Sequence, residues 1–159
     1  MNKLTVLFAF IISTFFSTAQ TQQKEVESLK KVSGFPIGSS LRFVPFMNDA
    51  PLQKLQQHHF NSYTAGSDMK MYQISPRPNI YYWDRVDSIV AYTKKHNQRL
   101  FGHTLIWHSA TPRWIQKRAK TNPAWLDKFM KEYIQKYVSR YKGKVHGWDV
   151  VNEGFNTKG

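Results

Sequence analysis

The sequence contains no cysteine, and this absence excludes several kinds of protein. A disulfide-stapled scaffold, a cysteine-ligated zinc or iron–sulfur site and a thiol nucleophile all need that residue. Acidic residues are also few, since 10 Asp and Glu stand against 23 Lys and Arg and the formal net charge is +13. The 159 residues suffice for one ordinary domain, and an aromatic content of 15% suits a dense core, stacked sugar rings or stacked bases.

Residues 1–19 have the pattern of a cleavable signal peptide. Lys3 gives a positive start, residues 4–16 are nearly all apolar, and Ser17 to Ala19 supply small residues before a cleavage point. The apolar run is shorter than the roughly 20 residues that a spanning helix needs. An uncleaved anchor is the alternative, which the polar residues from Gln20 onward disfavour. We expect a secreted or periplasmic protein, without membrane attachment after cleavage, in which residues 20–33 form a polar entry segment.

The basic residues are scattered rather than gathered in one run. Several, such as Lys94, Lys128 and Lys131, fall on the polar side of predicted helices. No zinc-finger or RNP-type motif accompanies them. The charge therefore indicates a solvated positive surface, and we expect no nucleic-acid partner.

Predicted strands and helices alternate along the rest of the chain. Apolar runs predict strands over 34–38, 59–65, 99–107 and 144–153, while caps and a 3.6-residue period predict helices over 48–57, 83–96 and 122–141. This order is typical of parallel strands joined by helices, as in a doubly wound open sheet or part of a (β/α)8 barrel. The segment 34–40 lacks the GxGxxG phosphate loop, which disfavours the open nucleotide-binding sheet.

Chemically versatile side chains lie where these strands end, which is where parallel α/β folds place their sites. Glu153 follows an apolar strand, and strand alternation would point it to the same side as Asp149. A partly buried carboxylate has a raised pKa and can act as a general acid, although a helix cap or an ion pair would explain Glu153 equally well. His103 and Trp107 share one face of their strand and His108 lies on the other. A histidine beside an aromatic wall suits a polyhydroxylated ligand, and the spacing matches no usual zinc site.

Three segments, which occur in the family's order along the chain, resemble glycoside hydrolase family 10, the endo-1,4-β-xylanases. Residues 102–109 (GHTLIWHS) are similar to the family's GHTLVWH strand, and residues 148–153 (WDVVNE) to the strand that carries its acid/base glutamate. Residues 60–70 resemble its FNxxTxENxMKW segment, and residues 35–38 its first strand. The match spans roughly residues 30–155. It implies an α/β fold, a (β/α)8 TIM barrel of which this chain holds about the first four βα units, over residues 34–159.

The resemblance also implies an activity and a set of residues. Glu153 would be the general acid/base of a retaining hydrolase that cleaves internal bonds of xylan or a related β-1,4-linked polysaccharide, without metal or organic cofactor. Asn152 would hydrogen-bond the sugar, and Asn61, Lys70, His103 and Trp107 would bind substrate. Oligomeric state is left open.

Two departures from the family pattern stand out. Gly66 and Ser67 replace the family's Glu-Asn pair and Met71 replaces its Trp, which leaves the choice of polysaccharide open. The family's nucleophile lies in the second half of its barrel, and no carboxylate of this chain can be assigned to it. We therefore expect the 159-residue chain alone to be inactive. The alternative function is a non-catalytic remnant that binds carbohydrate.

Overall fold

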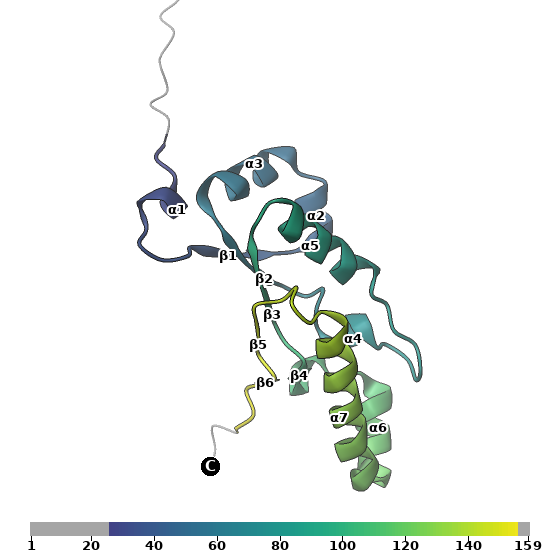
Figure 1. The fold of residues 1–159 in the computed structure, drawn as a ribbon. Helices are drawn as coiled ribbons and strands as arrows, with labels where there is room; N and C mark the ends of the chain where they lie inside the picture. Colours follow the sequence, from purple (N-terminus) through teal and green to yellow (C-terminus); the bar gives the residue numbers. More distant parts are fainter. Residues whose placement is uncertain (1–25, 156–159) are drawn as a thin grey trace, which may run out of the picture.

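The computed structural model describes residues 26–155, so the predicted signal peptide lies outside the described part of the chain (Figure 1). None of the helices within it is long and apolar enough to cross a membrane. The elements follow one another as α1 (Leu29–Val32), β1 (Gly38–Leu41), α2 (Phe43–Met47), α3 (Ala50–His59), β2 (Ser62–Ala65), α4 (Met71–Ile74), α5 (Asp84–Lys95), β3 (Arg99–Gly102), β4 (Ile106–Trp107), η1 (His108–Ala110), α6 (Arg113–Thr121), α7 (Pro123–Arg140), β5 (Gly147–Trp148) and β6 (Val151–Asn152).

All strands pair in parallel, as the alternating pattern predicts. The main sheet has the order β1-β2-β3-β5, and β4 pairs with β6 in a second, two-stranded sheet. In the main sheet β1, β2 and β3 lie side by side in chain order and β5 follows β3, with helical segments in each connection, and this is the arrangement of successive βα units. Figure 1 shows α5, α6 and α7 on the same side of the strands.

The core lies between the sheet and these helices. In β2 every second residue is buried, so Tyr63 and Ala65 are inaccessible to solvent, and Leu100 of β3 is equally buried. They belong to one apolar cluster with Val86 and Ile89 of α5. A domain without disulfides depends on such a cluster for its stability.

Helix α7 contributes an aromatic column, defined as Trp125, Phe129, Tyr133, Tyr137 and Tyr141. These side chains recur every fourth residue and therefore line one face of the helix. Successive ring centroids are 4.9, 6.0, 5.8 and 5.6 Å apart. The start of α7 was predicted correctly. Asn122 caps the helix, because its Oδ1 atom accepts a hydrogen bond from the Trp125 N–H at 3.0 Å.

The C-terminal end of the aromatic column is tied to α5 by an ion pair. The Arg140 side chain binds the Asp87 carboxylate at 2.5 Å, and the Tyr141 hydroxyl donates to the same carboxylate at 2.8 Å. Burial alone would raise the pKa of Asp87, but the hydrogen bonds from Arg140 and Tyr141 outweigh it and hold that pKa below its usual value. The two helices are thus joined by polar as well as apolar contacts.

The two long strands predicted over 99–107 and 144–153 are each interrupted. Strand β3 ends at Gly102 and β4 begins at Ile106, while β5 ends at Trp148 and β6 begins at Val151. Between them the Leu105 N–H donates to the Asp149 carbonyl and the Asp149 N–H donates to the Gly102 carbonyl, both at 3.0 Å. Backbone groups in one interruption therefore bond to the interruption of the neighbouring strand. The prediction that side chains alternate continuously along the strand through Glu153 is wrong.

The limits of other elements also differ from the predictions. The first strand is Gly38–Leu41 rather than 34–38, and Phe35 is 70% exposed. Helix α3 continues to His59, so β2 starts three residues later than expected. Helix α6 was not predicted. Apolar sequence alone could not locate β1, because its limits depend on pairing with β2.

Two glycines allow β3 and β5 to approach closely. A Cβ atom on Gly147 would lie 2.5 Å from the Phe101 ring, and one on Gly102 would lie 2.2 Å from the Trp148 ring. The two aromatic rings therefore pack over the glycines of the opposite strand.

We expect Gly147→Ala to lower the free energy of unfolding by about 1–3 kcal/mol, because the added methyl group overpacks against Phe101. Urea denaturation of the full chain would measure this change. Gly34→Ala is the matched control, since a Cβ atom there meets nothing within 4 Å. Equal stability of the two variants would contradict the close packing described above.

A second prediction compares two fully buried tyrosines of the aromatic column. The Tyr137 hydroxyl donates to the Met69 carbonyl at 3.2 Å, whereas the Tyr133 hydroxyl has no partner among the described residues. Tyr137→Phe should cost about 0.5–1.5 kcal/mol of stability, while Tyr133→Phe should be neutral or stabilising because it removes an unpaired polar group. Urea midpoints would test the contrast, and the reverse order would refute it.

Candidate active site

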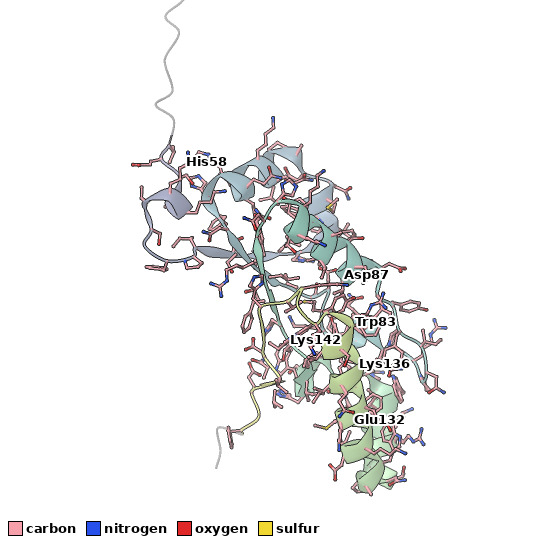
Figure 2. All side chains as sticks on the ribbon, in the orientation of Figure 1. His58, Trp83, Asp87, Glu132, Lys136 and Lys142 are labelled. Carbon is pink, nitrogen blue, oxygen red and sulfur yellow. The ribbon has the colours of Figure 1, made fainter. Side chains whose placement is uncertain are left out.

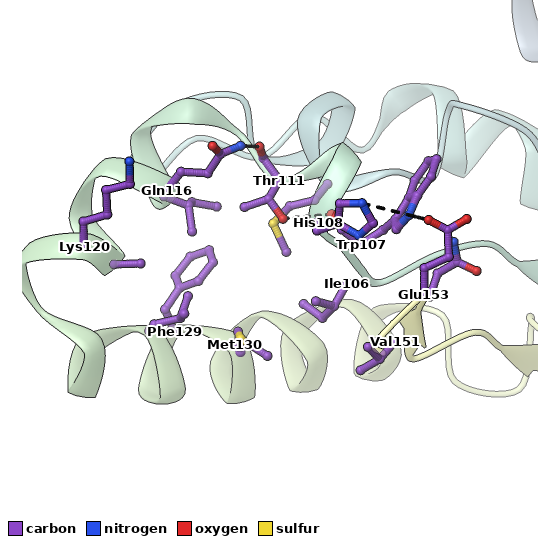
Figure 3. A pocket seen from close by; sticks show the side chains of 16 residues that line it. Ile106, Trp107, His108, Thr111, Gln116, Lys120, Phe129, Met130, Val151 and Glu153 are labelled. Atoms are coloured by element: carbon purple, nitrogen blue, oxygen red, sulfur yellow. Dashed lines mark hydrogen bonds and ion pairs between the residues drawn. The ribbon is translucent and has the colours of Figure 1, made fainter. Parts of the chain in front are cut away.

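The candidate site lies where β4 and β6 end side by side. Their parallel register pairs Ile106 with Val151 and Trp107 with Asn152, so Glu153 comes directly beyond the pair (Figure 3). Residues 46 positions apart in sequence are brought together in this way. The resemblance predicted roles for Trp107, Asn152 and Glu153, and the structure places them together.

Glu153 is held by a hydrogen bond from an indole. The Trp107 Nε1–H donates to Glu153 Oε2 at 2.7 Å, and His108 Nε2 lies 4.0 Å from the same oxygen. The Glu153 backbone has a φ of 51°, in the left-handed region, because it follows β6 at a turn of the chain. Its side chain is 58% exposed, so the expectation of a partly buried carboxylate is not met by residues 26–155.

His108 is closer to this carboxylate than strand alternation suggested. Strand β4 ends at Trp107, and the short helix η1 begins at His108. The change of backbone conformation turns the imidazole back toward Glu153, and its ring makes an edge contact with Trp107 at 6.1 Å. The prediction that His108 points away was therefore wrong.

His103 is oriented by the Asp149 carboxylate, which strand alternation predicted to lie on the same side as Glu153. His103 Nδ1 lies 2.8 Å from Asp149 Oδ2, and the His103 and Trp107 rings are 6.5 Å apart. Both residues of the pair lie in the gaps where the long strands are interrupted. Fixing one ring nitrogen leaves Nε2 as the atom that can meet a ligand. Asp149 thus serves as the partner of His103.

Lys70 reaches the site from the segment that follows β2. Its Nζ atom donates to the Gly66 carbonyl at 2.6 Å and lies 5.5 Å from the centroid of the Trp107 ring. Burial lowers the pKa of the Lys70 ammonium, and the nearby Asp68 carboxylate opposes that shift. The backbone of Gly66, one of the positions that depart from the family pattern, therefore helps to position Lys70.

Asn61 is not brought to this group. It precedes β2 and so lies at the opposite end of that strand from Lys70. Its Oδ1 atom accepts a hydrogen bond from the Ile37 N–H at 2.9 Å, and its carbonyl accepts one from the Arg99 N–H at 2.9 Å. Asn61 joins the amino ends of three strands, and the prediction that it binds substrate is corrected.

A groove of about 620 Å³ extends from Glu153 along α6 and α7. Figure 3 shows Trp107, His108 and Glu153 at one end of it and Phe129 and Met130 farther along. Most of its other lining residues are apolar, among them Ile106, Ile115, Leu126 and Val151. The sequence did not reveal this groove, because it forms between helices whose packing the sequence does not specify. No group of three metal-binding side chains occurs within residues 26–155.

Comparison with known proteins gives this arrangement a family. Residues 26–159 match the model of glycosyl hydrolase family 10. The chain is 37% identical over 155 residues to a β-1,4-xylanase of Dictyoglomus thermophilum, covering 96% of this chain and 42% of that protein. It is 33% identical over 165 residues to endo-1,4-β-xylanase A of Xylanibacter ruminicola, covering 100% of this chain and 44% of that protein.

Solved structures agree with the sequence comparisons. A GH10 structure from Paenibacillus barcinonensis has a TM-score of 0.75 and 37% identity, covering 84% of this chain and 40% of that one. A mutant of Cellvibrio japonicus Xylanase10C in complex with xylopentaose has a TM-score of 0.71 and 28% identity, covering 84% of this chain and 28% of that one. The chain thus spans less than half the length of these relatives and holds a corresponding part of their TIM barrel. It belongs to glycosyl hydrolase family 10.

Proposed function

We propose that this chain forms part of a secreted, retaining endo-1,4-β-xylanase in which Glu153 is the general acid/base. The observation that carries the proposal is the indole hydrogen bond to Glu153 at the shared end of β4 and β6. Support comes from the relatives, which are xylanases, and from the similar structure that holds xylopentaose. The exposed Glu153 carboxylate is accessible to a polymer lying in the groove.

In this mechanism Glu153 carries out both proton transfers, and its neighbours orient it or bind the sugar. Glu153 protonates the oxygen that leaves as the glycosidic bond breaks, and it then removes a proton from the water that releases the sugar. Trp107 holds one carboxylate oxygen at 2.7 Å, which leaves the other free to face the glycosidic oxygen. His103 and Asn152 lie within the same site and can donate hydrogen bonds to sugar hydroxyls. Such hydrogen bonds strengthen when positive charge develops on the sugar ring in the transition state.

A retaining hydrolase needs a second carboxylate as the nucleophile. Asp149 is close in sequence, but its carboxylate is engaged by His103 at 2.8 Å. We therefore do not assign the nucleophile to Asp149. We propose instead that the nucleophile lies in a part of the protein outside this chain. Xylan hydrolysis should therefore be measured on the full-length protein, which would contain both carboxylates.

We expect Glu153→Gln in the full-length protein to lower kcat/KM on xylan by about 10²–10⁴-fold, because the amide keeps the shape but cannot transfer the proton. Aryl xylosides with good leaving groups should be less affected in the bond-breaking step, since they need less protonation. Glu27→Gln is the control, an exposed carboxylate outside the groove. Unchanged xylan turnover in Glu153→Gln would overturn the assignment, and xylan binding without hydrolysis by the unmutated protein would favour a carbohydrate-binding remnant.

Trp107→Phe keeps an aromatic ring but removes the hydrogen bond to Glu153. A hydrogen bond to a charged group is worth about 1.5–3 kcal/mol, so kcat/KM should fall by about ten- to a hundredfold. Tyr92→Phe is the matched control, because it also removes a 2.7 Å side-chain hydrogen bond, the one from Gln57, but far from Glu153 in the fold. Steady-state kinetics on xylan would compare the two, and equal effects would show that the Trp107 bond has no special role.

A further inference from the structure

A second pocket lies on the outer side of the α6–α7 pair, away from Glu153. We call it the outer pocket; its volume is about 290 Å³, and the side chains used below are Asn79, Tyr81, Arg118, Trp125, Glu132 and Lys136. Phe129 lines both this pocket and the groove described above, so α7 separates the two. Figure 2 shows Glu132 and Lys136 along α7, with Trp83 nearby.

The aromatic walls of the outer pocket hold each other in place. Trp125 stacks on Phe129 with centroids 4.9 Å apart, and Tyr81 stacks on Trp83 at 5.4 Å with planes only 7° apart. The Trp114 indole N–H, also at this pocket, donates to the Ser75 carbonyl at 3.0 Å. These contacts mean that little side-chain freedom remains to be lost when a ligand binds.

Two cations line the pocket and rest on these aromatic rings. The Arg118 guanidinium lies 4.4 Å from the centroid of Trp125, and the Lys136 ammonium lies 4.5 Å from that of Tyr81. Within residues 26–155 neither forms an ion pair with a carboxylate, whereas Glu132 lies 3.8 Å from Lys128. The pocket therefore offers two positioned positive charges, and its one acidic side chain is partly neutralised.

The surrounding surface favours an anion as well. Between Arg113 and Lys144 the sequence has ten Lys and Arg residues and two acidic ones, Asp127 and Glu132. All ten basic residues are solvent-exposed. Such an excess of one sign raises the local concentration of oppositely charged ligands at moderate salt.

We propose that the outer pocket binds a uronate, a sugar unit that carries a carboxylate, in an acidic polysaccharide. Arg118 would bind the carboxylate, Lys136 would add to the positive potential of the pocket, and the exposed edges of the aromatic walls would contact the ring. Asn79 and the Glu132 carboxylate would accept hydrogen bonds from ring hydroxyls. The inference rests on the proposed function in taking a polysaccharide as the ligand, and it adds a second site and a charge class.

Binding of sodium D-glucuronate, with D-xylose as the neutral comparison, tests the proposal by calorimetric or NMR titration of the full chain. Arg118→Gln should weaken glucuronate binding about tenfold or more, the ratio that corresponds to about 1.4 kcal/mol, and Lys136→Gln should weaken it by a smaller factor that still exceeds about twofold. Lys131→Gln is the matched control, because it removes the same charge from α7 outside the pocket. Its glucuronate affinity should change less than twofold.

Several results would overturn the uronate site. An equal loss in Lys131→Gln would show that only the overall charge matters, and equal affinity for xylose would show that the carboxylate is not recognised. Displacement of glucuronate by equimolar inorganic phosphate or by duplex DNA would indicate a general anion surface. Because all three substituted side chains are exposed, unchanged thermal unfolding should confirm that each variant is folded.

Failure of this site and failure of the proposed function give different results. Glucuronate binding is measured without hydrolysis, so it should survive in Glu153→Gln. If glucuronate affinity is unchanged in Arg118→Gln and Lys136→Gln while xylan hydrolysis still depends on Glu153, only the outer site is overturned. Xylan hydrolysis that is independent of Glu153 would overturn the proposed function, whatever binds in the outer pocket.

Discussion

The packing of Tyr137 in the aromatic column is the interaction on which the rest of the structure depends. Its ring contacts Trp148 of β5 at 5.1 Å and Trp83 at 5.0 Å, and its hydroxyl binds the Met69 carbonyl. Met69 precedes Lys70 and Trp148 precedes Asp149, so one buried side chain positions two groups of the site. Large aromatic side chains supply much of the apolar area that a core without disulfides needs.

The interrupted strands are a second constraint, and they explain the chemistry of the site. A continuous strand would send alternate side chains to opposite faces of the sheet. The gap in each strand instead lets His103 meet Asp149, and the change to η1 lets His108 approach Glu153. Departure from regular structure at this edge is what gathers the polar groups in one place.

Positive charge and aromatic rings are combined throughout the outer surface. Arg118 lies over Trp125, Lys136 over Tyr81, and Arg140 over Trp83 at 5.2 Å. The charged heads remain in water while their stems cover the rings, so a strongly basic surface can lie directly on an aromatic core. The same arrangement provides cations for an anionic ligand without a further change in the fold.

The sequence by itself determined the parallel α/β class, the start of α7 and the position of Glu153 at the end of a strand, because these follow from local periodicity and from capping by Asn122. It did not determine the interruption of the strands or the positions of His108 and Asn61. Those depend on hydrogen bonds between segments 24 to 46 residues apart, which no local pattern records. Only the tertiary structure decided that Asp149 would pair with His103 and that α6 and α7 would separate two pockets, because both outcomes arise from packing between distant elements.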